Sequence, residues 1–137
     1  MEKVEFNNDG GKLHAEMKMD GLVIISYTLQ LWSSDVSDEK IVQSESGNNK
    51  QAHDDKFWLR NKDKEDEPVS ANNGRFLESI CTVHAANNEH TYTIELVIYQ
   101  TIDGEEQELG KDTFSDTIKP GDNGHRPNLG IELIGIE

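Results

Sequence analysis

Cysteine, basic residues and long apolar runs are all scarce in this chain of 137 residues. The one cysteine, Cys81, cannot form an intramolecular disulfide, so the fold must rest on its apolar core. The longest apolar run, residues 22–25, is far shorter than the roughly 20 residues that a helix needs to cross a bilayer. These absences exclude a disulfide-stapled scaffold and a membrane-spanning helix within these residues.

The scarcity of basic residues narrows the choice of partners. The chain has 13 Lys and Arg against 27 Asp and Glu, which gives a formal net charge of −14. An acidic surface repels the phosphates of nucleic acids and the headgroups of anionic membranes. We therefore expect no nucleic-acid binding and no membrane insertion, and a partner that is a basic or neutral protein, a small molecule or a glycan.

Familiar targeting and catalytic motifs are also missing. Residues 1–9 show no positive segment followed by an apolar stretch, so no export signal is recognised and a cytoplasmic location is expected. The chain has no glycine-rich phosphate loop, no G-x-S-x-G elbow and no H-E-x-x-H pair. We therefore expect a protein that is not an enzyme, although these absences leave room for a catalytic site assembled from distant strands.

What the sequence does contain is frequent turn signals between short apolar runs. Asn, Asp and Gly cluster at many points, and they tolerate the positive φ angles of tight turns. The runs between them are rich in β-branched and aromatic residues. This pattern predicts an all-β fold, a single antiparallel β-sandwich domain over residues 1–137 with about 7–9 strands and long polar loops.

The clearest strand is residues 91–101, where Ile94, Leu96 and Ile98 alternate with more polar residues. We expect it to be a central strand with these three side chains in the core. Asp103-Gly104 predicts a two-residue hairpin into residues 105–114. Residues 75–84 are expected to form a second hairpin with 91–101, in a register that the sequence leaves open.

Other segments are less regular. Residues 13–19 and 22–32 form a candidate hairpin, with a phase change at Ile24-Ile25 that suggests a β-bulge or a crossing between sheets. Residues 129–136 read as a final strand, apolar on both faces and so a candidate for a central position. Residues 61–74 are expected to form a charged, mobile loop.

Two groups of residues are candidates for binding. Calcium prefers carboxylate and carbonyl oxygens on loops, and Asp35 and Asp38 on one loop with Asp54 and Asp55 on another could supply them. No other cofactor is expected. The second group is the two tryptophans, Trp32 and Trp58, because an exposed indole beside polar groups suits sugar stacking. A buried indole would only pack between the sheets.

The histidines give a weaker signal. In one register of the 75–84/91–101 hairpin, His84 and His90 would face each other and could share a metal ion. The sequence therefore favours a non-catalytic β-sandwich binding or protein-interaction module. The alternatives are a structural subunit of a larger β-rich assembly, which would pair through bare strand edges, and a calcium- or carbohydrate-binding domain.

Overall fold

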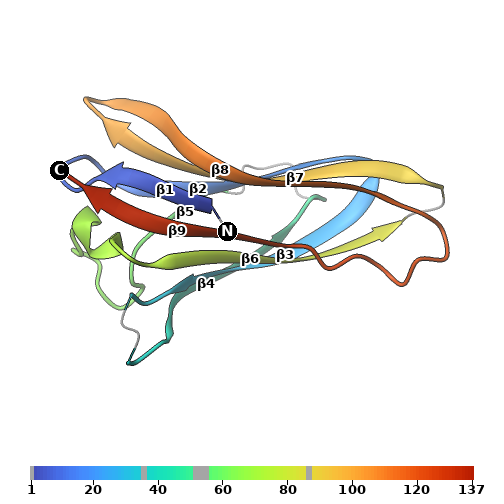
Figure 1. Cartoon of the computed structure of the whole chain (residues 1–137), viewed down its shortest axis with the longest axis horizontal. Helices are drawn as coiled ribbons and strands as arrows, with labels where there is room; N and C mark the ends of the chain where they lie inside the picture. The colour runs from blue at the N-terminus through green and yellow to red at the C-terminus, as the bar shows by residue number, and fades with distance from the viewer. Residues whose placement is uncertain (1, 35–36, 51–55, 86–87) are drawn as a thin grey trace.

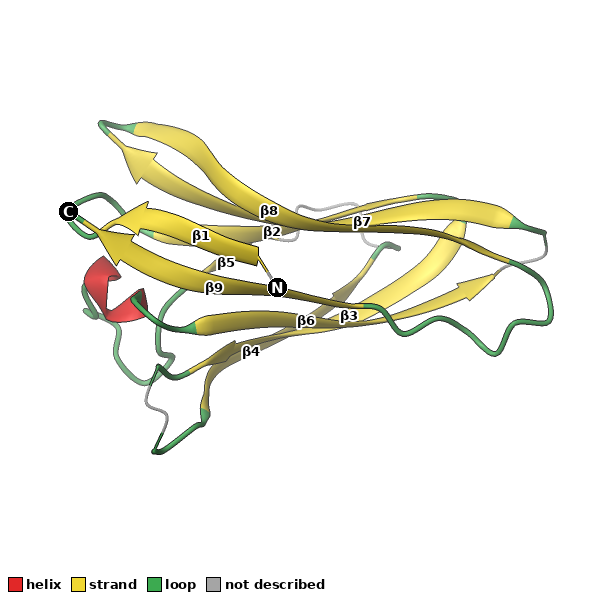
Figure 2. Ribbon diagram, in the orientation of Figure 1, coloured by secondary structure: helices red, strands yellow, loops and turns green. Residues whose placement is uncertain are grey.

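The chain folds as two β-sheets packed face to face (Figure 1). The computed structural model describes residues 2–34, 37–50, 56–85 and 88–137. Within these residues the chain forms nine strands and one short 3-10 helix. Figure 2 shows the helix at one end of the sandwich, with the rest drawn as strand and loop. The predicted all-β sandwich is confirmed.

The strands divide into a five-stranded and a four-stranded sheet. The five-stranded sheet, here called sheet A, runs in the order β1 (Glu2–Asn7), β9 (Asn128–Ile136), β6 (Phe76–Ala85), β3 (Val23–Trp32) and β4 (Ile41–Asn48). The four-stranded sheet, sheet B, runs in the order β5 (Lys56–Trp58), β2 (Leu13–Asp20), β7 (His90–Ile102) and β8 (Glu105–Ile118). The 3-10 helix η1 is Val69–Asn72. Strand β1 pairs with β9 in parallel, and the other described strand pairs are antiparallel.

The core lies between the two sheets and is built from alternate side chains of each strand. On β7, Ile94, Leu96 and Ile98 are each 0% exposed, as predicted. This strand is central in sheet B, because it pairs with β2 on one side and with β8 on the other. Buried side chains of β3, β6 and β9, such as Ile25 and Ile131, complete the same core from sheet A.

The predicted hairpin between residues 75–84 and 91–101 is wrong. Strand β6 belongs to sheet A and pairs with β3 and β9, whereas β7 belongs to sheet B. Two consecutive strands each bury one face whether they pair in a hairpin or lie in different sheets. The alternation of apolar and polar residues therefore does not distinguish the two arrangements. The two strands therefore face each other across the core instead of sharing backbone hydrogen bonds.

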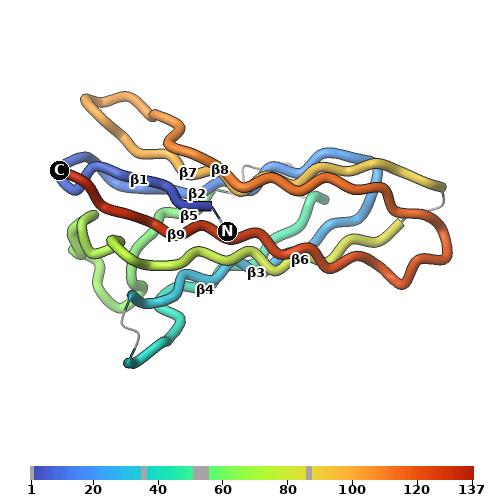
Figure 3. The backbone as a smooth tube through the Cα atoms, in the orientation of Figure 1, coloured from blue at the N-terminus to red at the C-terminus, as the bar shows by residue number. Residues whose placement is uncertain are grey.

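The predicted hairpin between residues 13–19 and 22–32 is wrong for the same reason, since β2 lies in sheet B and β3 in sheet A. The expected phase change at Ile24-Ile25 is absent, because β3 buries Val23 and every second residue after it. Crossing between sheets, which the sequence offered as an alternative to a bulge, takes place earlier, around Gly21. Figure 3 shows this connection, the end of β6 and the start of β7 at the same end of the sandwich.

Gly21 is required at this crossing. It has a φ of +129°, and an added Cβ would lie 2.9 Å from the carbonyl oxygen of Thr91, near the start of β7. A side chain there would meet both an unfavourable backbone angle and a neighbouring backbone. Leu22, just after it, is 76% exposed, so this apolar residue contributes nothing to the core.

Two other sequence expectations agree with the structure. Strands β7 and β8 form a hairpin around Asp103 and Gly104, whose φ angles are 53° and 81°, as a two-residue turn of this kind demands. Strand β9 is central in sheet A, between β1 and β6. Only one of its two faces is buried, since Leu129, Ile131 and Leu133 point into the core while the residues of the other phase are partly covered or exposed.

Candidate functional site

The predicted calcium residues are not brought together by the described structure. Asp35, Asp54 and Asp55 lie outside the described residues. Asp38 is exposed; its carbonyl accepts a hydrogen bond from Ser33 Oγ at 3.0 Å, and its carboxylate lies 3.9 Å from Lys40 Nζ. Within the described parts of the chain, no three His, Cys, Asp or Glu side chains are arranged to hold a metal ion. Calcium binding therefore stays a prediction.

The two tryptophans lie in different sheets. Trp32 ends β3 in sheet A, where it is half-buried beside Phe76 and Ile41 on the neighbouring strands. Trp58 ends β5 in sheet B and is 45% exposed. The sequence could not separate the two, but the structure places Trp58 at a pocket.

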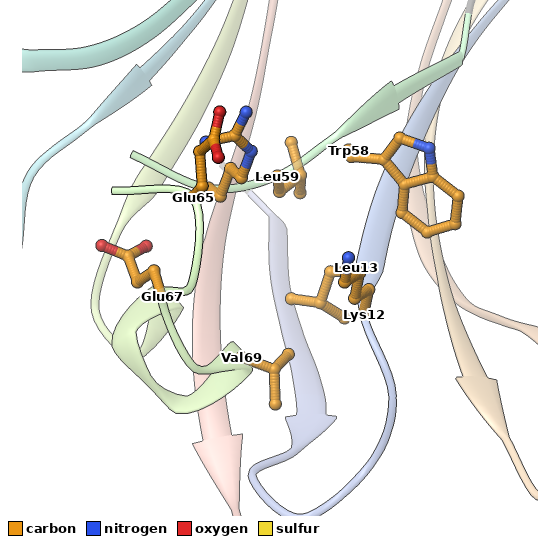
Figure 4. Close-up of a pocket in the computed structure, with 8 residues that line it drawn as sticks. Lys12, Leu13, Trp58, Leu59, Glu65, Glu67 and Val69 are labelled. Carbon is orange, nitrogen blue, oxygen red and sulfur yellow. The ribbon is translucent and has the colours of Figure 1, made fainter. Parts of the chain in front are cut away.

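The pocket beside Trp58 has a volume of about 140 Å³ (Figure 4). It is lined by Lys12, Leu13, Trp58, Leu59, Arg60, Glu65, Glu67 and Val69. Leu13, Leu59 and Val69 supply apolar surface, and charged groups stand around it. The two walls have different origins, because Lys12, Leu13 and Trp58 belong to the edge of sheet B, while the other five lie on the segment between β5 and β6.

The segment 59–75 is held against the sandwich by a chain of hydrogen bonds. Leu59 N donates to the carbonyl of Leu13 at 3.0 Å, which prolongs the pairing of β5 with β2. Asn72, which is 1% exposed, donates from Nδ2 to the carbonyl of Leu59 at 3.1 Å and accepts from Arg75 Nη1 at 3.1 Å. The charged loop expected at residues 61–74 is thus anchored to the core at several points.

A buried ion pair completes this anchor. Arg75 donates two parallel hydrogen bonds to Glu67, one of them from Nη2 to Oε2 at 2.9 Å, and the two side chains are only 9% and 5% exposed. Glu67 also accepts from the backbone N–H of Asn61 at 3.2 Å. The Arg75 hydrogen bonds lower the pKa of Glu67 below its ordinary value, although burial opposes this shift. Glu67 is therefore a satisfied carboxylate that shapes the pocket wall.

A second buried ionisable group lies next to Trp58 on the outer surface of sheet B. The alternation of β2 turns Leu13 and Ala15 inward and His14 outward, yet His14 is 0% exposed. Its ring stacks on Tyr99 with centroids 4.9 Å apart, and meets Trp58 edge to face at 5.2 Å. Neighbouring strands on both sides of β2 thus cover a residue that strand periodicity predicts to be exposed.

Two carboxylates and a lysine surround the same histidine. Glu16 Oε2 lies 3.4 Å from His14 Nε2, and Glu106 Oε1 lies 3.9 Å from His14 Nδ1. Lys56 donates to Glu106 Oε1 at 2.7 Å, and this hydrogen bond is the main cause that lowers the pKa of Glu106. Lys56 Nζ also lies 5.0 Å from the centroid of the Trp58 ring, within cation–π range.

A third cluster lies around Tyr92, near the start of β7, whereas Tyr99 of the His14 site lies near the end of the same strand. Tyr92 Oη and His125 Nδ1 form a hydrogen bond at 2.8 Å, and Asp116 and Asp122 lie 3.6 and 3.5 Å from the two ring nitrogens. Burial, together with the charge of Asp116, raises the pKa of Tyr92 to about 12. Tyr92 is 1% exposed, so this contact ties the chain near His125 to the core.

The sequence marked Trp58 as a candidate for stacking and Glu67 as one of several loop carboxylates, but gave His14 and Arg75 no role. No local signal marks these residues, since their burial depends on strands and loops that are distant in the chain. His84 and His90, which the sequence pairs in one hairpin register, lie on strands of different sheets.

The described residues contain no helix that is both long and apolar enough to span a membrane. Comparison of the chain with protein-family models, with curated proteins and with solved structures finds no match.

Proposed function

We propose that this protein is a non-catalytic binding module that takes one ring of a saccharide at the Trp58 pocket. The observation that carries the proposal is a half-exposed indole at the mouth of a pocket whose floor is apolar and whose rim is charged. A flat aromatic ring packs against the C–H face of a sugar, and nearby polar groups bind its hydroxyls.

The polar groups at the rim have capacity for a ligand. Lys12 and Arg60 form no ion pair with another described residue, so their N–H groups can donate to hydroxyl oxygens. Glu65, which also lines the pocket, can accept hydrogen bonds from hydroxyl groups. Glu67 is already bound to Arg75 and contributes shape instead of a ligand contact.

The volume of the pocket limits the size of the ligand. Pockets for drug-sized ligands measure about 300–1,000 Å³, whereas this one measures about 140 Å³. A single sugar ring has roughly 12 non-hydrogen atoms, and at about 0.3 kcal/mol for each atom its binding free energy is about −4 kcal/mol, or a Kd near 1 mM. Useful affinity would then come from several rings or from several copies of the module.

The edges of the sheets favour a binding module over a structural subunit. Strand β8 carries Glu105, Glu106 and Glu108 on an edge of sheet B, and charge on an edge disfavours pairing with another chain. On the β4 edge of sheet A, Lys62 donates from its backbone N–H to the carbonyl of Val42 at 3.0 Å and thereby covers part of the strand.

A non-catalytic role is supported by the position of the groups that resemble general acids and bases. His14 and Tyr92 are 0% and 1% exposed, and neither lines the pocket. A general base must come within hydrogen-bond reach of the proton that it removes. A substrate in the pocket would therefore meet neither group in this arrangement.

The proposal is tested by ligand binding in a variant with a single fluorescent indole. The chain has two tryptophans, so W32F leaves Trp58 as the only one. A panel of neutral and acidic mono- and oligosaccharides should include a sugar that changes Trp58 emission in a saturable way. The variant W58A should lose binding measured by calorimetry, and V69F, which fills the pocket without altering Trp58, should weaken it.

The W32F variant also serves as the control, because Trp32 lies in sheet A and should not contribute. Binding that survives W58A but is lost in W32F would move the ligand surface to sheet A. A panel that leaves the Trp58 emission and its indole N–H signal unchanged at 10 mM sugar, about ten times the estimated Kd, would overturn the saccharide assignment.

A further inference from the structure

The buried histidine beside Trp58 has an incomplete set of hydrogen bonds. His14 Nδ1 has no hydrogen-bond partner among the described residues, although it is shielded from solvent. The other ring nitrogen, Nε2, has only a long contact of 3.4 Å with Glu16. Buried polar atoms usually have partners, and an orphaned one is a cost to the folded state.

The carboxylates define which form of the ring would satisfy the site. A neutral imidazole carries one N–H, so its other nitrogen presents a lone pair. With Glu16 facing Nε2 and Glu106 facing Nδ1, either neutral tautomer directs a lone pair at a carboxylate. An imidazolium would instead present an N–H to each carboxylate. Because the two carboxylates lie at opposite ring nitrogens, they cannot share one metal ion with His14, and a proton fits the geometry better.

A competing contact holds the site in its present arrangement. Lys56 competes for the same carboxylate, since it donates to Glu106 Oε1 at 2.7 Å. The other groups that face the ring are Tyr99 from β7 and Trp58 from β5, and Lys18 lies beyond Tyr99, donating to its hydroxyl at 2.7 Å.

Lys56 links this site to Trp58, the aromatic residue of the pocket. Its ammonium group contacts Glu106 on one side and lies over the Trp58 ring on the other, with 5.0 Å to the centroid. A move of Glu106 toward His14 would weaken one of the contacts that hold Lys56 in place. The ring face of Trp58 that Lys56 occupies would then be open to a ligand.

We propose that His14 is a proton switch for the Trp58 pocket. On protonation, His14 Nδ1 donates to Glu106, Lys56 leaves the indole, and the affinity for a stacked sugar ring rises. The ligand part of this inference rests on the proposed function, whereas the proton-driven release of Lys56 does not. By linkage, a ligand that displaces Lys56 also favours the protonated ring.

The switch is tested first without any ligand. In the W32F background, collisional quenching of Trp58 by acrylamide is measured from pH 8 to pH 5, the range in which imidazoles ordinarily change charge. Quenching should increase toward pH 5, and NMR signals of the His14 ring should change over the same pH interval. In K56M, quenching should be high and independent of pH, because the group that covers the indole is gone.

Variants at two positions keep the test decisive. H14F should abolish the pH dependence of quenching. E106Q, at an exposed position where misfolding is not a concern, should abolish it too. The matched control is E108Q, a neighbour on β8 that forms no ion pair with another described residue and should leave the dependence unchanged.

Quenching that is independent of pH in the W32F protein, or a dependence that survives H14F or E106Q, would overturn the switch. If a sugar ligand has been found, its Kd should fall about fivefold or more between pH 8 and pH 5, the lower end of common coupling strengths. A pH-dependent release of Lys56 with no sugar bound by the panel would uphold the switch and reject the saccharide. A sugar bound equally at both pH values, with no change in quenching, would uphold the saccharide assignment and reject the switch.

Discussion

Two buried ionisable groups flank the Trp58 pocket, and they differ in how well they are paired. Glu67 in the pocket wall receives two hydrogen bonds from Arg75 and a third from the backbone. His14 beside the indole has a carboxylate near each nitrogen but only one long hydrogen bond. A complete set of partners holds a buried group in one arrangement, whereas an unpartnered buried nitrogen is a cost to the folded state.

We therefore assign Glu67 a role in stabilising the pocket wall and His14 a role in the response to pH. The Glu67–Arg75 pair joins two ends of a loop that forms one wall of the pocket, and any loss of a partner leaves a charge without compensation. His14 already has an unsatisfied nitrogen, so a proton can improve its contacts. Three predictions test this contrast.

The largest effect should come from breaking the satisfied pair. The variant R75M leaves the Glu67 carboxylate buried without its cation and should lower the free energy of unfolding by about 3–5 kcal/mol. The double variant E67M/R75M should recover much of this loss, because no buried charge remains. Urea denaturation of the two variants and the parent protein measures both values. If R75M lowered the free energy of unfolding by less than about 1 kcal/mol, the pair would stabilise the fold no more than an exposed surface ion pair does.

An intermediate effect should appear in acid. The pKa of Glu67 is lowered in the folded protein from its ordinary value of 4.5, mainly by the Arg75 hydrogen bonds. A lowered folded-state pKa adds stability that is fully present above the unfolded-state pKa and is lost as pH falls through the folded-state pKa. The parent protein should therefore lose stability below about pH 4.5, and E67Q, although less stable at neutral pH, should lose less over this range. Parallel acid slopes for the two proteins would contradict the assignment.

The smallest effect should come from removing the unsatisfied group. H14F replaces the imidazole with an apolar ring of similar shape and removes a buried nitrogen that lacks a partner. The free energy of unfolding at neutral pH should change by less than about 1.5 kcal/mol, in either direction. Thermal and urea unfolding at pH 7.5 measure it. A loss of several kcal/mol would show that His14 stabilises the fold as strongly as Arg75 does, and the contrast would fail.

Local pattern was sufficient for the general form of the fold. Ile94, Leu96 and Ile98 are core residues of a central strand because strand alternation is a property of neighbouring residues. The Asp103-Gly104 turn was predictable for the same reason, since the two residues adopt the positive φ angles by themselves. The choice of Trp58 as a binding residue rested on its chemistry, and the structure places it at a pocket.

The assignment of strands to sheets was not predictable from such patterns. A run such as residues 76–85 buries one face whether it pairs beside β7 or packs across the core from it. The distinction depends on which backbone groups bond to each other, and here β6 bonds to β3 and β9, segments far away in the chain. Two hairpins that looked natural from short connections are therefore crossings between sheets.

By itself, the sequence determined an acidic, all-β sandwich with no disulfide, and it marked Trp58 as one of two aromatic candidates. Only the tertiary structure decided that His14, on the outward phase of its strand, is covered by Trp58, Tyr99 and the Lys56–Glu106 pair. The physical reason is the separation along the chain of the residues that interact. Alternation and turn chemistry act between adjacent residues, whereas the burial of an outward side chain is set by neighbouring strands that come from distant parts of the chain.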